Sequence, residues 1–289
     1  MAAVASQIVL HPLVSQSIKL LGTTLGRDKI YRTVQYFARF LAWVLLTQGY
    51  KLEASRWNSL KNALASGRKL MRLMKPVEHL QAALRASQLS SLRAYPIEQY
   101  TTIARQISYA GYLSVEHLQA ALRASQLSSL RAYPIEQYTT IARQISYAGY
   151  LSLDAVVWLN SIRFLNLTPA TSTKASKASQ RFWLSGILFS IVHGLVKVAR
   201  LANEAKRLRS VSEKGVGADA DRSSKAMALD IDRYNTRYQL IQDSFDFFLP
   251  ASNLGLVGVN DGAAGIIGVI TSVMALQLQW KSVGKSMGK

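Results

Sequence analysis

Five aliphatic side chains recur at helical spacing in the segment GRKLMRLMKPVEHLQAAL. They follow one another at steps of three, four, three and four, and they are Leu70, Leu73, Val77, Leu80 and Leu84. On an α-helix this spacing confines them to about 80° of arc. Such a stripe can enter a lipid leaflet, where burying each side chain contributes about 1.5 to 3 kcal/mol, before the costs of ordering and desolvation are subtracted. The spacing therefore predicts physical insertion into a membrane rather than a reaction.

Basic residues lie on the other side of the same helical segment. Arg68, Arg72 and Lys75 cluster there, and each cation near an anionic leaflet adds about 1 kcal/mol of attraction. We expect the stripe to insert and these three residues to bind the headgroups of an anionic phospholipid membrane. Pro76 predicts a bend, unless it starts a new helix. From this segment alone, an amphipathic helix packed on its neighbours explains the pattern equally well.

Residues for other chemistry are sparse. The chain has no cysteine, and its four histidines (His11, His79, His117 and His193) lack metal-ligand spacing. The strings GTTLGRDK and VGKS both fail the phosphate-loop template, and we find no nucleophile elbow or zinc-protease motif. We therefore expect no enzyme, no catalytic or metal site and no cofactor.

The positive charge is strongly local. Of the net charge of +19, residues 1–76 carry twelve bases against two acids, whereas residues 199–246 carry nine against eight. A basic region suits phosphate, either of nucleic acid or of anionic lipid. The sequence has no recognition module for nucleic acid, and its apolar, glycine-rich C-terminal part argues against nucleic-acid binding.

The elements that must position these residues are helices. Helical periodicity dominates, and we predict an all-α, membrane-associated protein with an interfacial amphipathic helix and one or two hydrophobic C-terminal helices. Residues 182–198 are borderline for a span, and residues 262–280 are uncharged and end in a tryptophan. Because lysines follow, the positive-inside tendency predicts that both termini face the cytosol.

Three regions are expected along the chain. Residues 1–166 form a basic N-terminal helical region, 167–180 a flexible linker, and 181–289 a membrane-associated C-terminal region with a charged loop at 199–246. Small residues at steps of three and four predict close helix packing, and they are Gly255, Gly258, Gly262 and Gly265. The alternative is that these glycines begin a hairpin near Asp261.

Residues 77–114 and 115–152 are identical at every position, a tandem copy of 38 residues. Two identical units in an otherwise non-repeating chain argue against a solenoid and favour a recent duplication, an insertion or an error in the recorded sequence. We predict that the helix after Pro96 runs through Ser114 into the second copy and ends before Pro134. The extra copy then adds a helix, a turn and a helix.

The blocks from His11 to Trp43, KLMRLMKPVEHLQAALRA, YAGYLSLDAVVWLNSIRF and LGLVGVNDGAAGIIGVITSVMALQLQW together resemble the peroxin 11 family of peroxisomal membrane proteins, and the fungal members most. The resemblance implies location in the peroxisomal membrane, an amphipathic helix that inserts in one leaflet, and a role in elongating and dividing the organelle. It also implies self-association and recruitment of dynamin-related fission machinery. The departure from the family is the second 38-residue unit.

Two alternatives stay open. The two apolar segments, together with His193, Lys197 and Asp261, fit a solute channel or transporter of the peroxisomal membrane. A basic surface that only docks partners, without binding lipid, fits an adaptor.

Overall fold

The computed structural model describes residues 10–91, 134–212 and 219–287, which form eight α-helices and no β-strand. The all-α prediction is confirmed for this part of the chain. The helices are α2 (Pro12–Gly22), α3 (Thr24–Thr47), α4 (Lys51–Met71), α5 (Lys75–Ser91), α8 (Pro134–Ser161), α9 (Pro169–Ser212), α10 (Asp219–Asn253) and α11 (Asp261–Met287).

Local chemistry sets the helix ends near the predicted amphipathic segment. The Thr23 hydroxyl accepts a hydrogen bond from the Gly26 amide and starts α3. A turn at residues 72–74 separates α4 from α5. Pro76 lies in the first turn of α5, where its missing amide proton costs no hydrogen bond. The predicted bend is therefore present, as a break between two helices.

The chain divides into two compact units. The first contains Met1–Met74, Tyr150–Leu184 and Ser244–Lys289, and the second contains Lys75–Gly149 and Ser185–Asp243. Each of α8, α9 and α10 contributes residues to both units. Residues distant in sequence make up each unit, and the expected division of the chain at 166 and 181 stays a prediction.

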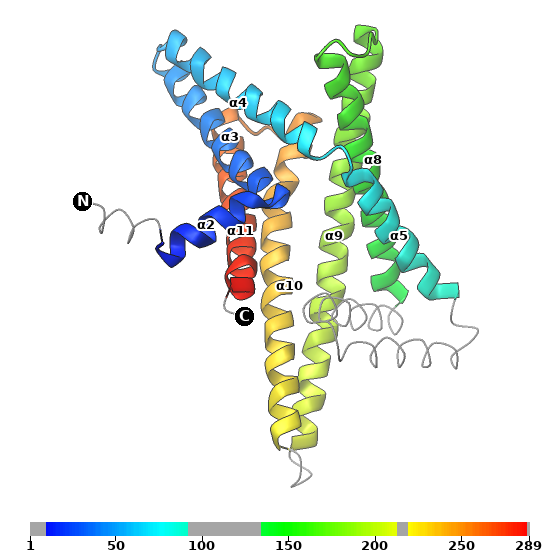
Figure 1. The fold of residues 1–289 in the computed structure, drawn as a ribbon. Coiled ribbons are helices and arrows are strands. Elements are labelled where there is room, and N and C mark those ends of the chain that lie inside the picture. The colour runs from blue at the N-terminus through cyan, green and yellow to red at the C-terminus, as the bar shows by residue number, and fades with distance from the viewer. Residues whose placement is uncertain (1–9, 92–133, 213–218, 288–289) are drawn as a thin grey trace. The chain divides into compact units, whose positions relative to one another are not determined.

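In the first unit, α3 packs between α4 and α11 (Figure 1). Its apolar core contains Tyr36, Leu249 and Ala264, with Trp183 and Ile267 packed against them. In the second unit, α5 and the described parts of α8, α9 and α10 surround a largely polar interior. The side chains of Ile187 and Leu201 are nevertheless fully buried there.

Two expected loops are helical instead. Residues 169–180, expected as a linker, form the first turns of α9. Thr168 precedes the helix and its hydroxyl accepts from the Thr171 amide, Pro169 occupies the first helical position, and the Ala and Lys residues that follow favour helix. The charged segment 199–246 forms the end of α9 and most of α10, apart from residues 213–218, which are not described. Residues 92–133, with most of the predicted insertion, also lie outside the described residues.

Candidate membrane-binding surface

All five residues of the predicted stripe are exposed. Their exposed fractions lie between 38% and 60%, which is high for aliphatic side chains in a folded protein. Leu70 lies in the last turn of α4 and Leu73 lies in the turn that follows, both in the first unit. Val77, Leu80 and Leu84 share one face of α5 in the second unit, while Ala83 and Ala86 are buried on its other side. Each half of the stripe is thus free to contact lipid.

The basic residues are placed differently from the expectation. Arg68 is buried, and its Nε donates to Oδ1 of Asp28 at 3.0 Å. Arg72 lies 3.6 Å from the same oxygen, and Lys75 forms an exposed ion pair with Glu78. The expected solvent-facing basic side is therefore wrong for Arg68, because the buried carboxylate of Asp28 requires a counter-ion. Headgroup binding by the three residues stays a prediction.

Asp28 is held as a carboxylate by this arrangement. Burial alone would raise its pKa, but the charges of Arg68, Arg72 and Lys29 outweigh burial and hold the pKa below its usual value. The neighbouring Lys29 has its pKa lowered to about 8, first by burial and then by the charge of Arg32. The N-terminal half of α3 thus carries several charged side chains that face the interior of the first unit.

Charges are also paired inside both units. In the first, Arg32 donates to Asp246 of α10 at 2.5 Å and to the Thr271 hydroxyl of α11 at 3.2 Å. In the second, Arg200 of α9 donates to Glu136 of α8 at 2.7 Å, and Glu136 is 1% exposed. Burying such pairs is costly in any protein and is compensated only by close partners. Polar side chains therefore occupy positions that soluble proteins usually fill with apolar ones.

The outer surface of α9 is apolar. Its exposed large side chains are Phe182, Leu188, Phe189, Val192 and Leu195. At 100° per residue they cover one side of the helix, and the buried or polar Ile187, Ser190, His193, Lys197 and Leu201 cover the other. A helix with polar groups inward and apolar groups outward is suited to lipid contact.

Two helices in the described part of the chain are long and apolar enough to cross a membrane. They are the stretch Pro169–Leu208 of α9 and the stretch Asp261–Gly284 of α11. Only 22% of the most apolar window of α9 is buried inside the protein, which fits the exposed apolar side described above. Both segments expected from the sequence are thus present as candidate spans.

The predicted glycine stripe divides into two pairs. Gly262 and Gly265 lie on α11 against α3, where a Cβ at Gly265 would approach the backbone nitrogen of Phe40 to 2.8 Å. Gly255 and Gly258 lie in the turn between α10 and α11, with nothing within 4 Å of an added Cβ. Gly255 has φ of +75°, which favours glycine. The expectation of helix packing is therefore wrong for Gly255 and Gly258, which form the start of the α10–α11 hairpin.

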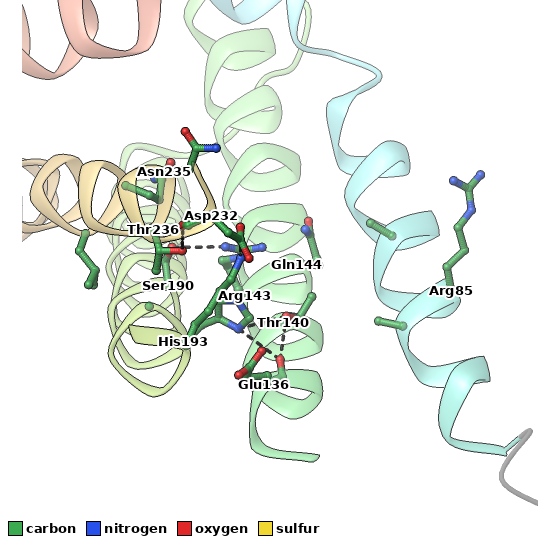
Figure 2. Close-up of a pocket in the computed structure, with 16 residues that line it drawn as sticks. Arg85, Glu136, Thr140, Arg143, Gln144, Ser190, His193, Asp232, Asn235 and Thr236 are labelled. Atoms are coloured by element: carbon green, nitrogen blue, oxygen red, sulfur yellow. Dashed lines mark hydrogen bonds and ion pairs between the residues drawn. The ribbon is translucent and has the colours of Figure 1, made fainter. Parts of the chain in front are cut away.

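The second unit contains a polar pocket of about 520 Å³, lined by residues of α5, α8, α9 and α10. Figure 2 shows Arg143 and Ser190 turned toward each other, joined by a hydrogen bond of 3.4 Å, whereas Arg85 points away. Lys197 pairs with Asp232 at 2.9 Å at this pocket. Asp261, grouped with His193 and Lys197 in the channel alternative, belongs to the first unit and pairs with Arg39.

The pocket was also compared with the side-chain groupings that bind metal ions. Within residues 10–91, 134–212 and 219–287, no three His, Asp or Glu side chains are grouped as metal ligands. His193 Nδ1 lies near the hydroxyls of Thr139 and Thr140 and near the carbonyl oxygen of Glu136, at 3.2 to 3.4 Å. The polar lining is suited to a small polar solute.

Inward-facing charges, apolar outer surfaces and two long apolar helices together define a membrane-associated helical protein. The family described as Peroxisomal biogenesis factor 11 (PEX11) matches residues 14–129 and again residues 114–280. The chain therefore belongs to this family. The two matches overlap at residues 114–129, inside the tandem repeat.

Curated relatives match nearly end to end. The chain is 26% identical over 280 residues to Peroxisomal membrane protein PMP27 of Saccharomyces cerevisiae, covering 96% of this chain and 99% of the relative. It is 21% identical over 297 residues to Peroxisomal membrane protein PMP30B of Candida boidinii, covering 96% and 98%. It is 21% identical over 277 residues to Peroxisomal biogenesis factor 11 of Schizosaccharomyces pombe, covering 93% and 96%. No solved structure matches the chain.

Proposed function

We propose that this chain remodels the peroxisomal membrane by inserting apolar side chains into one leaflet, which elongates the organelle and promotes its division and proliferation. The observation that carries this proposal is the exposure of all five stripe residues, at 38% to 60%. Full burial of an exposed aliphatic side chain is worth about 1.5 to 3 kcal/mol, and because these five expose about half of their surface, burying what remains is worth about 4 to 7 kcal/mol in total. The names of the relatives, peroxisomal membrane proteins and a peroxisomal biogenesis factor, support the location.

The cations then divide into two roles. Among the described residues, Lys75 pairs with an exposed carboxylate, Glu78, and such surface pairs are worth at most about 1 kcal/mol. A phosphate headgroup can therefore replace Glu78 at little cost. Arg68 would have to leave Asp28 in the interior, and breaking a buried pair costs about 3 to 5 kcal/mol. We therefore assign headgroup contact first to Lys75, and to Arg72 and Arg68 only in a state where Asp28 is released.

We further propose that both termini face the cytosol, that the chain self-associates, and that it recruits dynamin-related fission machinery. The orientation is supported by the basic N-terminal region and by the lysines after residue 280. Protease digestion of intact organelles tests it, because cytosolic termini lose N- and C-terminal tags. Protection of either tag would overturn the orientation. Self-association and recruitment follow from the family resemblance, and affinity purification of the tagged chain tests both.

The insertion mechanism is tested with the full chain in proteoliposomes of anionic phospholipid. We expect narrow tubules in electron micrographs of the wild type, and their loss when Leu73 and Leu80 are both changed to Glu. A carboxylate on the apolar stripe removes buried area and is repelled by the anionic surface.

Asn62→Glu with Gln81→Glu is the matched control. It adds the same charges at exposed positions of α4 and α5 outside the stripe, and we expect it to form tubules like the wild type. Equal tubulation by the stripe variant, at equal protein incorporation, would contradict insertion as the mechanism. Loss of tubules in both variants would show that charge alone, not the stripe, decides the outcome, and would also contradict it.

The polar pocket supports a second candidate, a solute channel or transporter. Its lining combines hydroxyl, amide and charged groups from four helices at a volume of about 520 Å³, within the usual range for small-molecule sites. We expect solute efflux from proteoliposomes to fall when Ser190, which faces Arg143, is replaced by Leu. Absence of efflux in the wild type would remove this candidate and leave membrane remodelling unaffected.

A further inference from the structure

A groove lies in the first unit, where α2 contacts both α3 and α11 (Figure 1). Two hydrogen bonds hold α2 against the C-terminal part of α11. Gln16 Nε2 donates to the Trp280 carbonyl at 2.8 Å, and Lys19 Nζ donates to the Ser286 carbonyl at 3.2 Å. The groove has a volume of about 620 Å³, within the usual range for small-molecule sites. Its apolar lining consists of Leu20, Leu21, Ile30, Val273, Leu276 and Trp280.

One end of this groove is apolar. The helices α3 and α11 run antiparallel, because the residue of α3 that faces Gly265 comes later in the chain than Arg32, which donates to Thr271. The same register places Ile30 at the level of Val273. Both side chains line the groove, so they form its apolar end, farthest from the C-terminal end of α11.

The other end of the groove is polar, and we call it the mouth. Lys281 lines it, together with Ser17. Lys19 is exposed beside it, and its contact with Ser286 is to a neutral carbonyl oxygen. The described residues that line the groove include no aspartate or glutamate. The mouth therefore combines two cations with a lining suited to an anionic group.

The length of the groove matches one leaflet of a membrane. Val273 and Lys281 are eight residues apart, which is about 12 Å along a helix. They lie in the last turns of the candidate span Asp261–Gly284. One leaflet supplies about 15 Å of a hydrocarbon core of about 30 Å. Trp280, next to the mouth, is a residue type that favours the level of the headgroups.

We propose that this groove binds one acyl chain of an anionic phospholipid, with the phosphate between Lys19 and Lys281. The chain lies along the apolar lining toward Val273, and the two ammonium groups bind the phosphate oxygens at the mouth. This site is separate from the stripe on α4 and α5. It requires that the protein resides in a membrane, but it does not depend on membrane remodelling.

Retention of lipid by the full chain tests the proposal. The protein is reconstituted in vesicles of phosphatidylcholine and phosphatidylserine, extracted in mild detergent and weighed by native mass spectrometry. We expect the wild type to retain one phosphatidylserine molecule per chain. A wild-type chain without bound lipid would overturn the proposal, and retention of a free fatty acid in place of the phospholipid would overturn the choice of ligand.

The substitution Val273→Trp fills the apolar end of the groove. We expect the ratio of lipid-bound to lipid-free chain to fall at least about tenfold, as for the loss of about two buried methylene groups. Ile270→Trp is the matched control, because Ile270 is also 38% exposed on α11 but does not line the groove. It should retain the lipid, and equal ratios in the two variants would overturn the proposal. Thermal unfolding of both variants shows whether the fold is kept.

A measurement on the wild type keeps the test valid if Val273→Trp fails to fold. Phosphatidylserine with a photoreactive diazirine on its acyl chain is crosslinked to the chain in the vesicles, and the labelled peptides are mapped. We expect labels between residues 273 and 281 and at Leu20 and Leu21. Equal labelling of Ile266 and Ile270, which are exposed outside the groove, would show general lipid contact only and would overturn the site.

The phosphate contact is tested by Lys19→Gln with Lys281→Gln. We expect the preference for phosphatidylserine over phosphatidylcholine to fall by about fivefold for each cation removed. Lys51→Gln with Lys174→Gln is the control, with the same loss of charge at exposed positions of α4 and α9. An unchanged preference in the first variant would overturn the phosphate contact.

The stripe variant separates this proposal from membrane remodelling. Leu73→Glu with Leu80→Glu changes residues that do not line the groove, so we expect it to retain the bound phospholipid while it loses tubulation. Loss of the lipid in this variant, with its fold kept, would overturn the separate site.

Discussion

Arg68 and Asp28 form a buried ion pair between α4 and α3, with Nε and Oδ1 3.0 Å apart and side chains 9% and 8% exposed. Arg68 also donates to Oε1 of Gln35 at 2.6 Å. Arg68, which its helical spacing placed among the predicted headgroup-binding cations, is thus part of the interior of the first unit. The surface left for lipid is mainly aliphatic.

Replacing Asp28 by Asn is expected to destabilise the first unit strongly. The change leaves the Arg68 guanidinium buried without a carboxylate, and breaking a buried pair costs about 3 to 5 kcal/mol in the free energy of unfolding. Denaturant unfolding in detergent measures it. The control is Asp261→Asn, which removes the more exposed partner of Arg39 and should cost about 1 kcal/mol or less. Equal losses for the two variants would contradict the buried pair.

The lowered pKa of Lys29 predicts that the free energy of unfolding increases at alkaline pH. Its pKa in the folded chain is about 8 against 10.5 when unfolded. Between these values the unfolded state binds more protons, so stability increases as pH rises from about 8 to 10.5. Thermal unfolding of wild type and Lys29→Met across this range measures the effect. The slope difference between them should vanish below pH 7, and parallel curves throughout would contradict the lowered pKa.

Replacing Gly265 by any larger residue is expected to destabilise the first unit. A methyl group there would approach the backbone nitrogen of Phe40 to 2.8 Å, so Gly265→Ala should separate α3 from α11 and destabilise by about 1 to 3 kcal/mol. Better helix propensity offsets up to about 1 kcal/mol of this. Unfolding in detergent measures the balance, with Gly258→Ala as the control in open space. A stabilised Gly265→Ala chain would contradict the close helix contact.

Substitutions on the apolar side of α9 are expected to weaken retention of the chain in a bilayer without changing its stability in detergent. Leu188→Gln with Leu195→Gln changes two exposed residues, so we expect the chain to become extractable from membranes by alkaline carbonate while its unfolding in detergent changes little. Ile187→Gln changes a residue that is 1% exposed and should lower stability in both settings, because it buries an unpaired amide. Full retention of the Leu variant in the membrane would contradict lipid contact on this side.

Much of the candidate surface was predictable from sequence because periodicity reports which residues share a helix face. The stripe from Leu70 to Leu84 was predictable in this way, whereas the break near Pro76 followed from the chemistry of proline and the two apolar segments from their length and lack of charge. Composition was a weaker guide at residues 169–180. Their Ser and Thr content suggested a linker, but Thr168, Pro169 and the alanines start a helix.

The sequence by itself determined that the chain is helical, that it carries an aliphatic stripe, and that a 38-residue segment occurs twice. Only the tertiary structure decided which charges face inward, as with Arg68 and Asp28, and which glycines lie between helices, as with Gly262 and Gly265. The physical reason is that periodicity fixes directions around one helix axis. Burial and ion pairing depend on which other helix lies on that side, and partners such as Arg32 and Asp246 are more than two hundred residues apart.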